Sequence, residues 1–255
     1  MSARPPLARL TRVTHLACPV VAYDWPFARM QAEAIAAHWR TRVARQPALF
    51  DGRVLLCRAP RCAEGVFHAD FFETDFSAFL AWRDFGWPDA RVFNGFAMAA
   101  LRSADGAHLL GEMAPHTANA GQCYFPAGTP DRDDVHNGAL DLAGSLAREL
   151  REETGFDIET ALVDPFWTVV AVSARIALMR GVRLPQTHDA AMAIARRHIA
   201  QDPHAELAGL RAVREMDDLA GATTPDFVRV YLQDMYAQER SARTRDRQSG
   251  GAQPG

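Results

Sequence analysis

The spacing of apolar and polar residues predicts helices and strands in the first third of the chain. Strands are indicated where apolar and β-branched residues dominate between turn residues, and a helix is indicated where apolar residues recur at spacings of three and four. Strands are therefore expected over 8–22, 54–57 and 65–73, and helices over 27–43 and 74–82. This part alternates helices with strands and contains only short elements.

A second group of elements begins near residue 91 with two apolar segments joined by an Asp-Gly turn, which is typical of a hairpin. The strongest helix follows, with Asp141 placed to cap its start and Gly155 placed to end it. The patterns predict strands over 91–103, 108–114, 166–184 and 206–214, and helices over 142–154, 187–201 and 226–238. The mixture indicates an α/β fold.

The two groups suggest three parts of the chain. Residues 1–90 form a small α/β extension that is too divided into short elements to be stable alone, so we expect it to pack against the rest. Residues 91–240 form the main domain. Residues 241–255 are polar and lack the apolar side chains that offset the entropy of ordering, which predicts a disordered tail.

Composition excludes several classes of protein. The 255 residues include 48% hydrophobic and 23% charged residues with a formal charge of -3, typical of a globular protein without the positive field that nucleic acid or an anionic membrane requires. All 28 basic residues are arginine. The four cysteines are too sparse for a disulfide framework, and the first residues lack the apolar core of a signal peptide. A cytoplasmic location is expected.

Three glutamates on the strongest helix are the main chemical signal. Glu149, Glu152 and Glu153 are spaced at i, i+3 and i+4, so they share one face of the helix. Grouped carboxylates repel one another unless a hard divalent cation such as Mg²⁺ or Mn²⁺ lies among them. The alternative is a solvated acidic face paired with Arg148 and Arg151. The spacing alone leaves both interpretations open.

The residues around these glutamates resemble a known motif. Residues 148–156, RELREETGF, match the second half of the Nudix box, R-E-U-x-E-E-x-G-U with U apolar, and YFPAGT at 124–129 is similar to the F-P-G-G segment that precedes it. The resemblance implies a Nudix-type α/β/α sandwich with a mixed sheet. It also implies an enzyme that uses Mg²⁺ or Mn²⁺ to hydrolyse the diphosphate of a nucleoside diphosphate linked to another group.

The resemblance assigns a role to each matched residue. It implies that Glu149, Glu152 and Glu153 bind the metal, together with the carbonyl oxygen of Gly128. Glu152 is also the glutamate expected to act on water, and Arg148 is expected to orient a glutamate of the helix. Divalent ions offset phosphate charge and lower the pKa of bound water, which agrees with these roles.

The first half of the box departs from the family pattern. Leu140 occupies the position of a glutamate, and the loop before the helix is about six residues longer than usual when it is aligned from the F-P-A-G segment. Asp131, Asp133 and Asp134 lie in this loop, where one of them replaces the absent carboxylate or all three belong to a solvated turn. Glu206 resembles the late loop carboxylate that some members use as a base, and a surface position is the alternative.

Residues 1–90 bear on the substrate and the assembly. FDG at 50–52, FETDF at 72–76 and WRDF at 82–85 loosely resemble the subgroup that hydrolyses UDP-sugars. UDP-sugars are therefore expected ahead of ADP-ribose, dinucleoside polyphosphates, NADH and coenzyme A. The many aromatic residues here fit a core, a wall that stacks a base, or the interface of a homodimer.

The missing glutamate at Leu140 motivates a second hypothesis from a different class of function. In this alternative the chain is a catalytically silent Nudix domain that binds a nucleotide metabolite as a sensor or adaptor.

Overall fold

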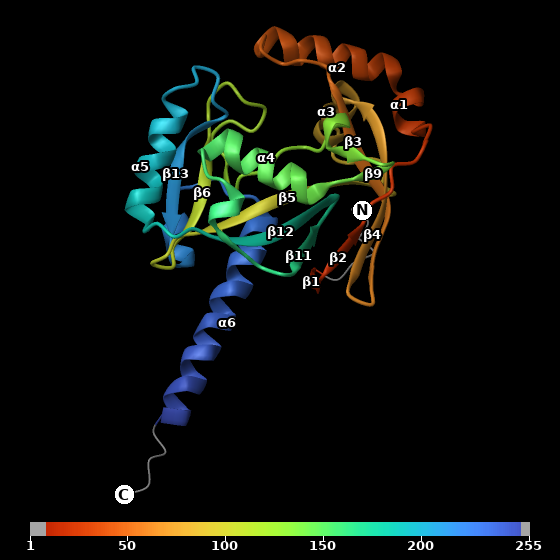
Figure 1. The fold of residues 1–255 in the computed structure, drawn as a ribbon. Coiled ribbons are helices and arrows are strands. Elements are labelled where there is room, and N and C mark those ends of the chain that lie inside the picture. Colours follow the sequence, from red (N-terminus) through yellow and green to blue (C-terminus); the bar gives the residue numbers. More distant parts are fainter. Residues whose placement is uncertain (1–8, 251–255) are drawn as a thin grey trace, which may run out of the picture.

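The computed structural model describes residues 9–250 (Figure 1). The strands are β1 (Leu10–Val13), β2 (His15–Ala17), β3 (Arg53–Ala63), β4 (Val66–Asp75), β5 (Val92–Arg102), β6 (His108–Met113), β7 (Cys123–Tyr124), β8 (Val135–His136), β9 (Ala139–Leu140), β10 (Leu162–Val163), β11 (Trp167–Val172), β12 (Arg175–Arg183) and β13 (Leu207–Val213). The α-helices are α1 (Pro26–Met30), α2 (Ala32–Arg45), α3 (Phe76–Asp84), α4 (Leu142–Thr154), α5 (His188–Ile199) and α6 (Asp226–Gly250). Short 3₁₀ helices include Arg132–Asp134 in the loop before α4.

A curled mixed sheet organises the molecule. Its strands follow the order β1-β11-β12-β5-β3-β4-β2, and β6 joins β5 to β13 and β7. The central pair, β5 and β12, is parallel, whereas most other neighbours are antiparallel. Helix α4 crosses in front of β5 and β12, and α6 begins behind β12 (Figure 1). The expected α/β fold, with helices packed on a mixed sheet, is confirmed.

The path through the sheet begins and ends in one short segment of chain. Strand β1 pairs with β11 and strand β2 pairs with β4, yet only Thr14 separates β1 from β2. The residues 8–22 that were expected to form one strand therefore form two, which pair with opposite ends of the sheet. The strands make a closed circuit that the backbone at Thr14 completes.

The N-terminal part of the chain contacts the rest through backbone as well as side chains. Besides β1, strand β3 pairs with β5, and the amide of Leu55 donates to the carbonyl of Pro130 at 2.8 Å. A separate apolar cluster joins side chains of α3, such as Trp82, to Trp25 and to Phe72 of β4. The core alternative therefore holds for the buried aromatic residues of this part, which are Trp25, Phe67, Phe71, Phe72, Phe79 and Trp82. The domain boundary near residue 90 stays a prediction.

Two elements differ from the sequence pattern because local signals were weak. The helix expected over 27–43 is divided at Gln31, whose φ of -107° and ψ of 17° are not helical. The strand expected over 166–184 is a hairpin with the two-residue turn Ser173 and Ala174, and Ser173 has a φ of 55°. Neither turn residue is the glycine, asparagine or aspartate that usually marks such a hairpin.

The predicted end of the last helix at residue 238 is wrong, whereas the predicted disorder of residues 241–255 stays a prediction. Helix α6 continues to Gly250, because residues 237–249 contain neither proline nor glycine and are rich in the helix formers alanine, arginine and glutamine. Residues 251–255 lie outside the described part. Neither α6 nor any other helix in residues 9–250 is long and apolar enough to cross a membrane.

A buried hydrogen-bond chain fixes α6 to the sheet. The hydroxyl of Tyr236 donates to the carbonyl of Val213 at 2.9 Å and lies 3.1 Å from Nδ1 of His108. Burial lowers the pKa of His108 to about 3, so its ring is neutral and Nδ1 donates to the hydroxyl, whose own proton is already engaged. The hydroxyl oxygen of Tyr236 is thus the shared partner of His108 and of the Val213 carbonyl.

We expect Tyr236→Phe to lower the free energy of unfolding by about 1 to 3 kcal/mol, because it leaves a buried donor and a buried acceptor unpaired. Urea denaturation measures the change. Tyr231→Phe is the matched control, since Tyr231 is buried on the same helix and its hydroxyl makes no hydrogen bond within residues 9–250. Equal costs for the two variants would contradict the importance of this chain of bonds.

Candidate functional site

Helix α4 presents the glutamates from a well-defined segment. The side chain of Asp141 accepts hydrogen bonds from the amides of Ala143 and Gly144 at the helix start. Gly155 ends the helix with a φ of 76°, a conformation that glycine adopts without strain. Both ends therefore match the sequence prediction, and Glu149, Glu152 and Glu153 lie on consecutive turns of one helix.

Glu153 is the most deeply buried of the three, with 6% of its surface exposed. Its Oε2 accepts a hydrogen bond from the amide of Ala127 at 3.2 Å, whereas its Oε1 is buried without a partner in the described residues. Burial raises the pKa of Glu153 well above its ordinary value, and the charges of Glu149 and Glu206 add to the effect. A cation bound next to this buried carboxylate oxygen would supply the partner that it lacks.

Glu149 lies against the loop that precedes α4. Burial raises its pKa to about 7 although Arg148 opposes the shift, and 14% of its side chain is exposed. A Cβ atom on Gly128 would lie 2.1 Å from Oε1 of Glu149, so no other residue fits there without displacing the carboxylate. The structure thus places Gly128 and Glu149 side by side, as the motif implied.

Arg148 connects the helix to the aspartate loop. One end of its guanidinium, Nη1, lies 2.8 Å from Glu149 and 3.2 Å from Glu152, and the other end, Nη2, lies 3.0 Å from Oδ1 of Asp134. The carboxylate of Asp134 is buried and also accepts from Ser145 and from the amide of Asp131, both at 3.1 Å. Asp134 therefore anchors Arg148.

The other loop residues have different environments. Asp131 caps the short helix of the loop by accepting from the amide of Asp133 at 2.8 Å, and Asp133 is exposed. Leu140, which occupies the glutamate position of the box, is buried in the core on β9. Of the three aspartates, Asp134 is the one that contacts the arginine of the motif.

The carboxylates are close to one another but are not gathered around a common point. Residues 9–250 contain no group of three or more His, Cys, Asp or Glu side chains arranged as metal ligands. Glu149 and Glu152 contact Arg148 instead, and Glu152 is 60% exposed. The donor set and the unpaired oxygen of Glu153 fit Mg²⁺ or Mn²⁺, provided that Glu149 and Glu152 turn away from Arg148.

Glu206 joins this site from the other side of a large cavity. The cavity has a volume of about 940 Å³, and Gly128, Glu149, Glu152 and Glu206 all line it. The negative charge of Glu206 raises the pKa of both Glu149 and Glu153, which shows that it lies within electrostatic range of α4. The structure therefore places Glu206, which lies outside the motif, on the same cavity as Gly128, Glu149 and Glu152.

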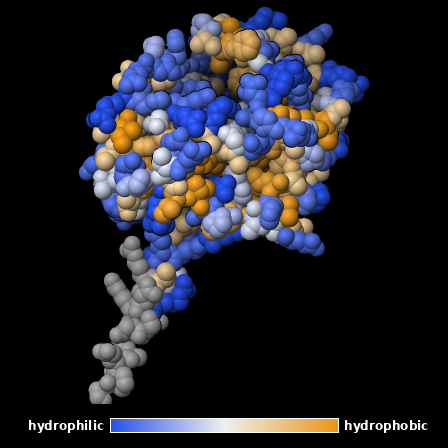
Figure 2. All heavy atoms as spheres, in the orientation of Figure 1, coloured by the Kyte–Doolittle hydropathy of each residue, from blue (hydrophilic) through white to orange (hydrophobic). Residues whose placement is uncertain are grey.

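The rest of the cavity has a different character. Aromatic side chains from both parts of the chain line it, including Phe76, Phe79, Trp87, Phe96 and Phe227. Polar residues there include Arg83, Asn94, Asn119 and Arg175. The space-filling view shows a hollow in the upper part of the molecule, with hydrophilic and hydrophobic side chains at its rim (Figure 2).

Sequence reasoning missed Asn94 and Arg175. Asn94 interrupts the apolar start of β5 in VFNGFA, whereas Arg175 is the first residue of β12 after the turn in AVSARIAL, and the two residues are paired in the parallel register of β5 and β12. A polar residue within or at the start of an apolar segment was the signal that could have found them, because burying such a group is costly without a partner.

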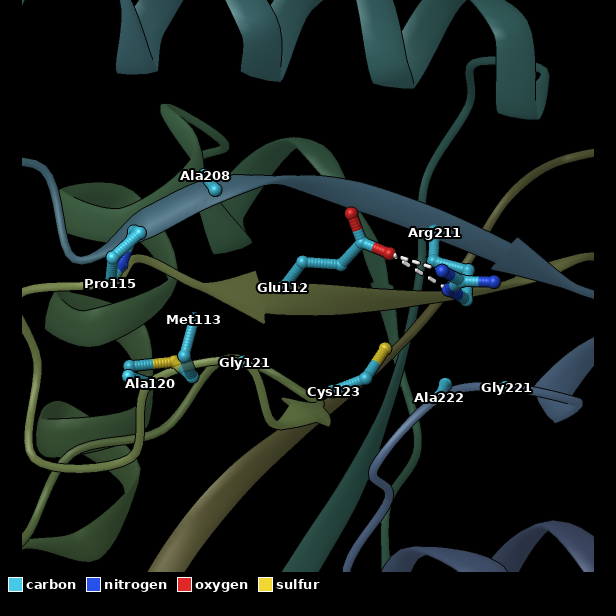
Figure 3. A pocket seen from close by; sticks show the side chains of 10 residues that line it. All are labelled: Glu112, Met113, Pro115, Ala120, Gly121, Cys123, Ala208, Arg211, Gly221 and Ala222. Carbon is cyan, nitrogen blue, oxygen red and sulfur yellow. Dashed lines mark hydrogen bonds and ion pairs between the residues drawn. The ribbon is translucent and has the colours of Figure 1, made fainter.

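A smaller pocket of about 530 Å³ is lined by residues of β6, β7 and β13 and of the loops beside them (Figure 3). Glu112 and Arg211 pair across these strands at 2.6 Å, and Cys123 lies on the neighbouring strand (Figure 3). Burial raises the pKa of Cys123 to about 11, so its thiol stays protonated at neutral pH. The pocket therefore offers neither a free carboxylate nor a reactive thiolate.

We expect Gly128→Ala to reduce turnover by about 10-fold while the protein stays folded, because the added methyl group displaces the carboxylate of Glu149. Gly209→Ala is the control, since a Cβ atom there meets nothing within 4 Å. Steady-state kinetics and thermal unfolding of both variants measure the two halves of this prediction. Wild-type turnover in Gly128→Ala would contradict the role of this contact.

This chain shows limited similarity to known proteins. No protein-family model matches the sequence, and no curated protein matches it. Among solved structures, a Nudix hydrolase, RenU, from M. smegmatis is 17% identical with a TM-score of 0.37, over 58% of this chain and 84% of that one. The MutT protein from Methanosarcina mazei Go1 is 15% identical with a TM-score of 0.37, over 58% of this chain and 95% of that one.

A third similar structure is the complex of the C-terminal domain of mouse MUTYH with human PCNA. It is 14% identical with a TM-score of 0.35, over 58% of this chain and 89% of that one. The assignment of a function to this chain therefore depends on its own residues.

Proposed function

We propose that the chain is a Nudix-type hydrolase that cleaves the diphosphate of a nucleoside diphosphate linked to another group. The observation that carries the proposal is the position of RELREETGF on α4. There Glu153 holds an unpaired buried oxygen and Glu149 lies against Gly128, at one end of a cavity large enough for a nucleotide. A solvated acidic face, the alternative at the sequence level, does not explain the buried Glu153 and the largely buried Glu149.

In this proposal the chain supplies ligands, orientation and a base. Glu149, Glu152, Glu153 and the Gly128 carbonyl would hold Mg²⁺ or Mn²⁺, which when bound neutralises phosphate charge and lowers the pKa of water. Arg148 stays in place through Asp134 when the glutamates leave it. Glu152, exposed to the cavity, takes a proton from the attacking water, and Glu206 is the second candidate for this role.

The proposed substrate is a UDP-sugar ahead of ADP-ribose and other dinucleotides. The segments that resemble the UDP-sugar subgroup contribute Phe76 and Arg83 to the cavity wall. The aromatic side chains there are suited to stack a nucleobase. Residues 1–90 therefore take part in selecting the substrate in this proposal, rather than only in forming a homodimer.

A substrate panel tests the proposal. UDP-glucose, ADP-ribose, NADH, coenzyme A and a dinucleoside polyphosphate are incubated with the protein and Mg²⁺ or Mn²⁺, and the nucleoside monophosphate formed is measured by chromatography. We expect turnover of at least one compound that depends on the metal. Metal-independent turnover, or none across the panel, would contradict the proposal.

A silent Nudix domain that binds a nucleotide metabolite is the second candidate function. Two observations favour it, the buried Leu140 in place of a glutamate and the lack of gathered metal ligands in residues 9–250. Calorimetry with the same panel distinguishes the two functions. Binding with micromolar affinity and no turnover supports the sensor, and turnover supports the enzyme.

A further inference from the structure

We propose that the end of the cavity opposite α4 binds a second anionic group of the substrate, a carboxylate or a phosphate, through Arg83 and Arg175. This inference deepens the proposed function and depends on it for the place of the diphosphate. It narrows the substrates to nucleoside diphosphate compounds that carry an anion on the linked group or on the nucleoside.

Arg175 is a cation without a direct ion pair among the described side chains. Its guanidinium lies over the ring of Phe227, with the carbon 5.1 Å from the ring centre, and its Nε is buried without a hydrogen-bond partner in the described residues. Within residues 9–250 no carboxylate oxygen lies within 4.0 Å of it. Burial lowers the pKa of Arg175, the negative charge of Asp226 opposes this shift, and the positive charge of Arg83 adds to it. A partly buried charge is stabilised further when a ligand pairs with it directly.

Arg83 brings a second cation to the same end. Its Nε donates to Asp84 at 2.9 Å, and its Nη1 donates to Oδ1 of Asn119 at 3.3 Å. Asp84 is shared, because His38 lies 2.9 Å and Arg42 lies 3.9 Å from its other oxygen. One carboxylate thus serves Arg83, Arg42 and His38 together.

The distance from α4 separates this end from the diphosphate site. Asn94 is paired with Arg175 across the sheet, and Met98, four residues along β5, also lines the cavity. Its neighbour Ala99 donates to Pro126, in the loop that leads to Gly128. Four residues of strand span roughly 13 Å. An anion at Arg175 is therefore a different group from a diphosphate held at α4.

Asn94 adds a further unfilled contact. Its Oδ1 is buried without a partner in the part of the chain that the structure describes. An amide beside two guanidinium groups, with aromatic walls around them, suits a polar group attached to a ring. At the α4 end of the cavity, the carboxylates of Glu149, Glu152 and Glu206 repel an anion unless a metal is present. The cavity therefore orients a substrate that carries two anionic groups.

Matched pairs of compounds test the inference. UDP-glucuronate and UDP-glucose differ by a carboxylate, whereas NADPH and NADH, or coenzyme A and its 3′-dephospho form, differ by a phosphate. For the pair that the protein accepts, we expect the anionic member to have a kcat/KM about 10-fold higher or more. Arg175→Gln should reduce this preference to near unity, and Arg175→Lys should retain part of it.

Arg180→Gln is the matched control. Arg180 lies on the same strand and also stacks on an aromatic ring, at 5.2 Å from Trp167, but it does not line the cavity. It should leave the preference unchanged. Thermal unfolding establishes that each variant is folded. If Arg175→Gln does not fold, Arg83→Gln, a substitution on α3, is used in the same test.

Calorimetry without metal distinguishes the failure of this inference from the failure of the proposed function. One outcome is that no compound is hydrolysed, an anionic member binds more tightly than its partner, and Arg175→Gln removes this difference. This outcome supports the anion site and contradicts the hydrolase. If compounds are hydrolysed and every pair gives equal kcat/KM values in the wild type, or the preference survives Arg175→Gln, the anion site is refuted. The pair that responds tells whether the group is a carboxylate or a phosphate.

Discussion

Glu153→Gln is expected to lower kcat/KM by about 10²-fold or more for whichever substrate the protein hydrolyses. Glutamine has the shape of glutamate and keeps an oxygen to accept from Ala127, so the loop is unchanged. It lacks the negative charge that a metal requires at the unpaired oxygen. A similar loss is expected for Glu152→Gln, because its exposed carboxylate is the proposed base.

The metal dependence of stability separates this explanation from a loss of folding. Without metal, Glu153→Gln should be at least as stable as the wild type, because it removes a buried carboxylate. The rise in melting temperature that Mg²⁺ or Mn²⁺ produces should become much smaller. Glu159→Gln, an exposed residue after the same helix, should change none of these quantities. Full activity in Glu153→Gln would show that the acidic face of α4 is not a metal site.

The metal-free protein should become less stable as the pH rises from about 4.5 to about 7. The folded protein raises the pKa of Glu149 from 4.5 to about 7, so in this interval the folded state binds more protons than the unfolded state. Stability from this group is complete below pH 4.5 and is lost as the pH passes 7. The shift corresponds to a change of roughly 3 kcal/mol.

Urea denaturation in EDTA at several pH values measures this dependence. Glu149→Gln should make the slope shallower, because the glutamine does not titrate, and the burial of Glu153 leaves a remaining slope of the same sign. Saturating Mg²⁺ should oppose the loss above pH 7, since ligands must be deprotonated to bind a metal. A stability that rises with pH in EDTA and is unaltered by Glu149→Gln would contradict the shifted pKa.

The helix that carries the glutamates could be predicted to the residue, whereas the cavity could not. Asp141, Gly155 and the periodicity of α4 are local signals, and each is satisfied within a few residues of chain. Arg175 and Asn94 meet only because β12 and β5 pair in parallel, which brings together residues 81 positions apart. No local pattern contains that information.

The loop before α4 shows the same limit within the motif itself. The sequence left three aspartates as equal candidates, and the choice of Asp134 depends on its burial and on its contact with Arg148. The predicted end of α6 was wrong for a different reason. The absence of apolar residues after residue 238 indicates a lack of packing, but helix propensity alone is sufficient for the helix to continue.

The closed circuit of strands has a consequence for the order in which the protein assembles. Strand β1 is synthesised before its partner β11, which begins more than 150 residues later in the chain. Until β11 has formed, β1 lacks its partner strand and stays open to pairing with other chains. Because contacts so distant in sequence close slowly, docking of residues 10–17 is expected to be the last and rate-limiting step of folding. A chain that lacks these residues would keep its glutamates and its cavity but would leave two sheet edges exposed. It should therefore aggregate, although the residues of its site are intact.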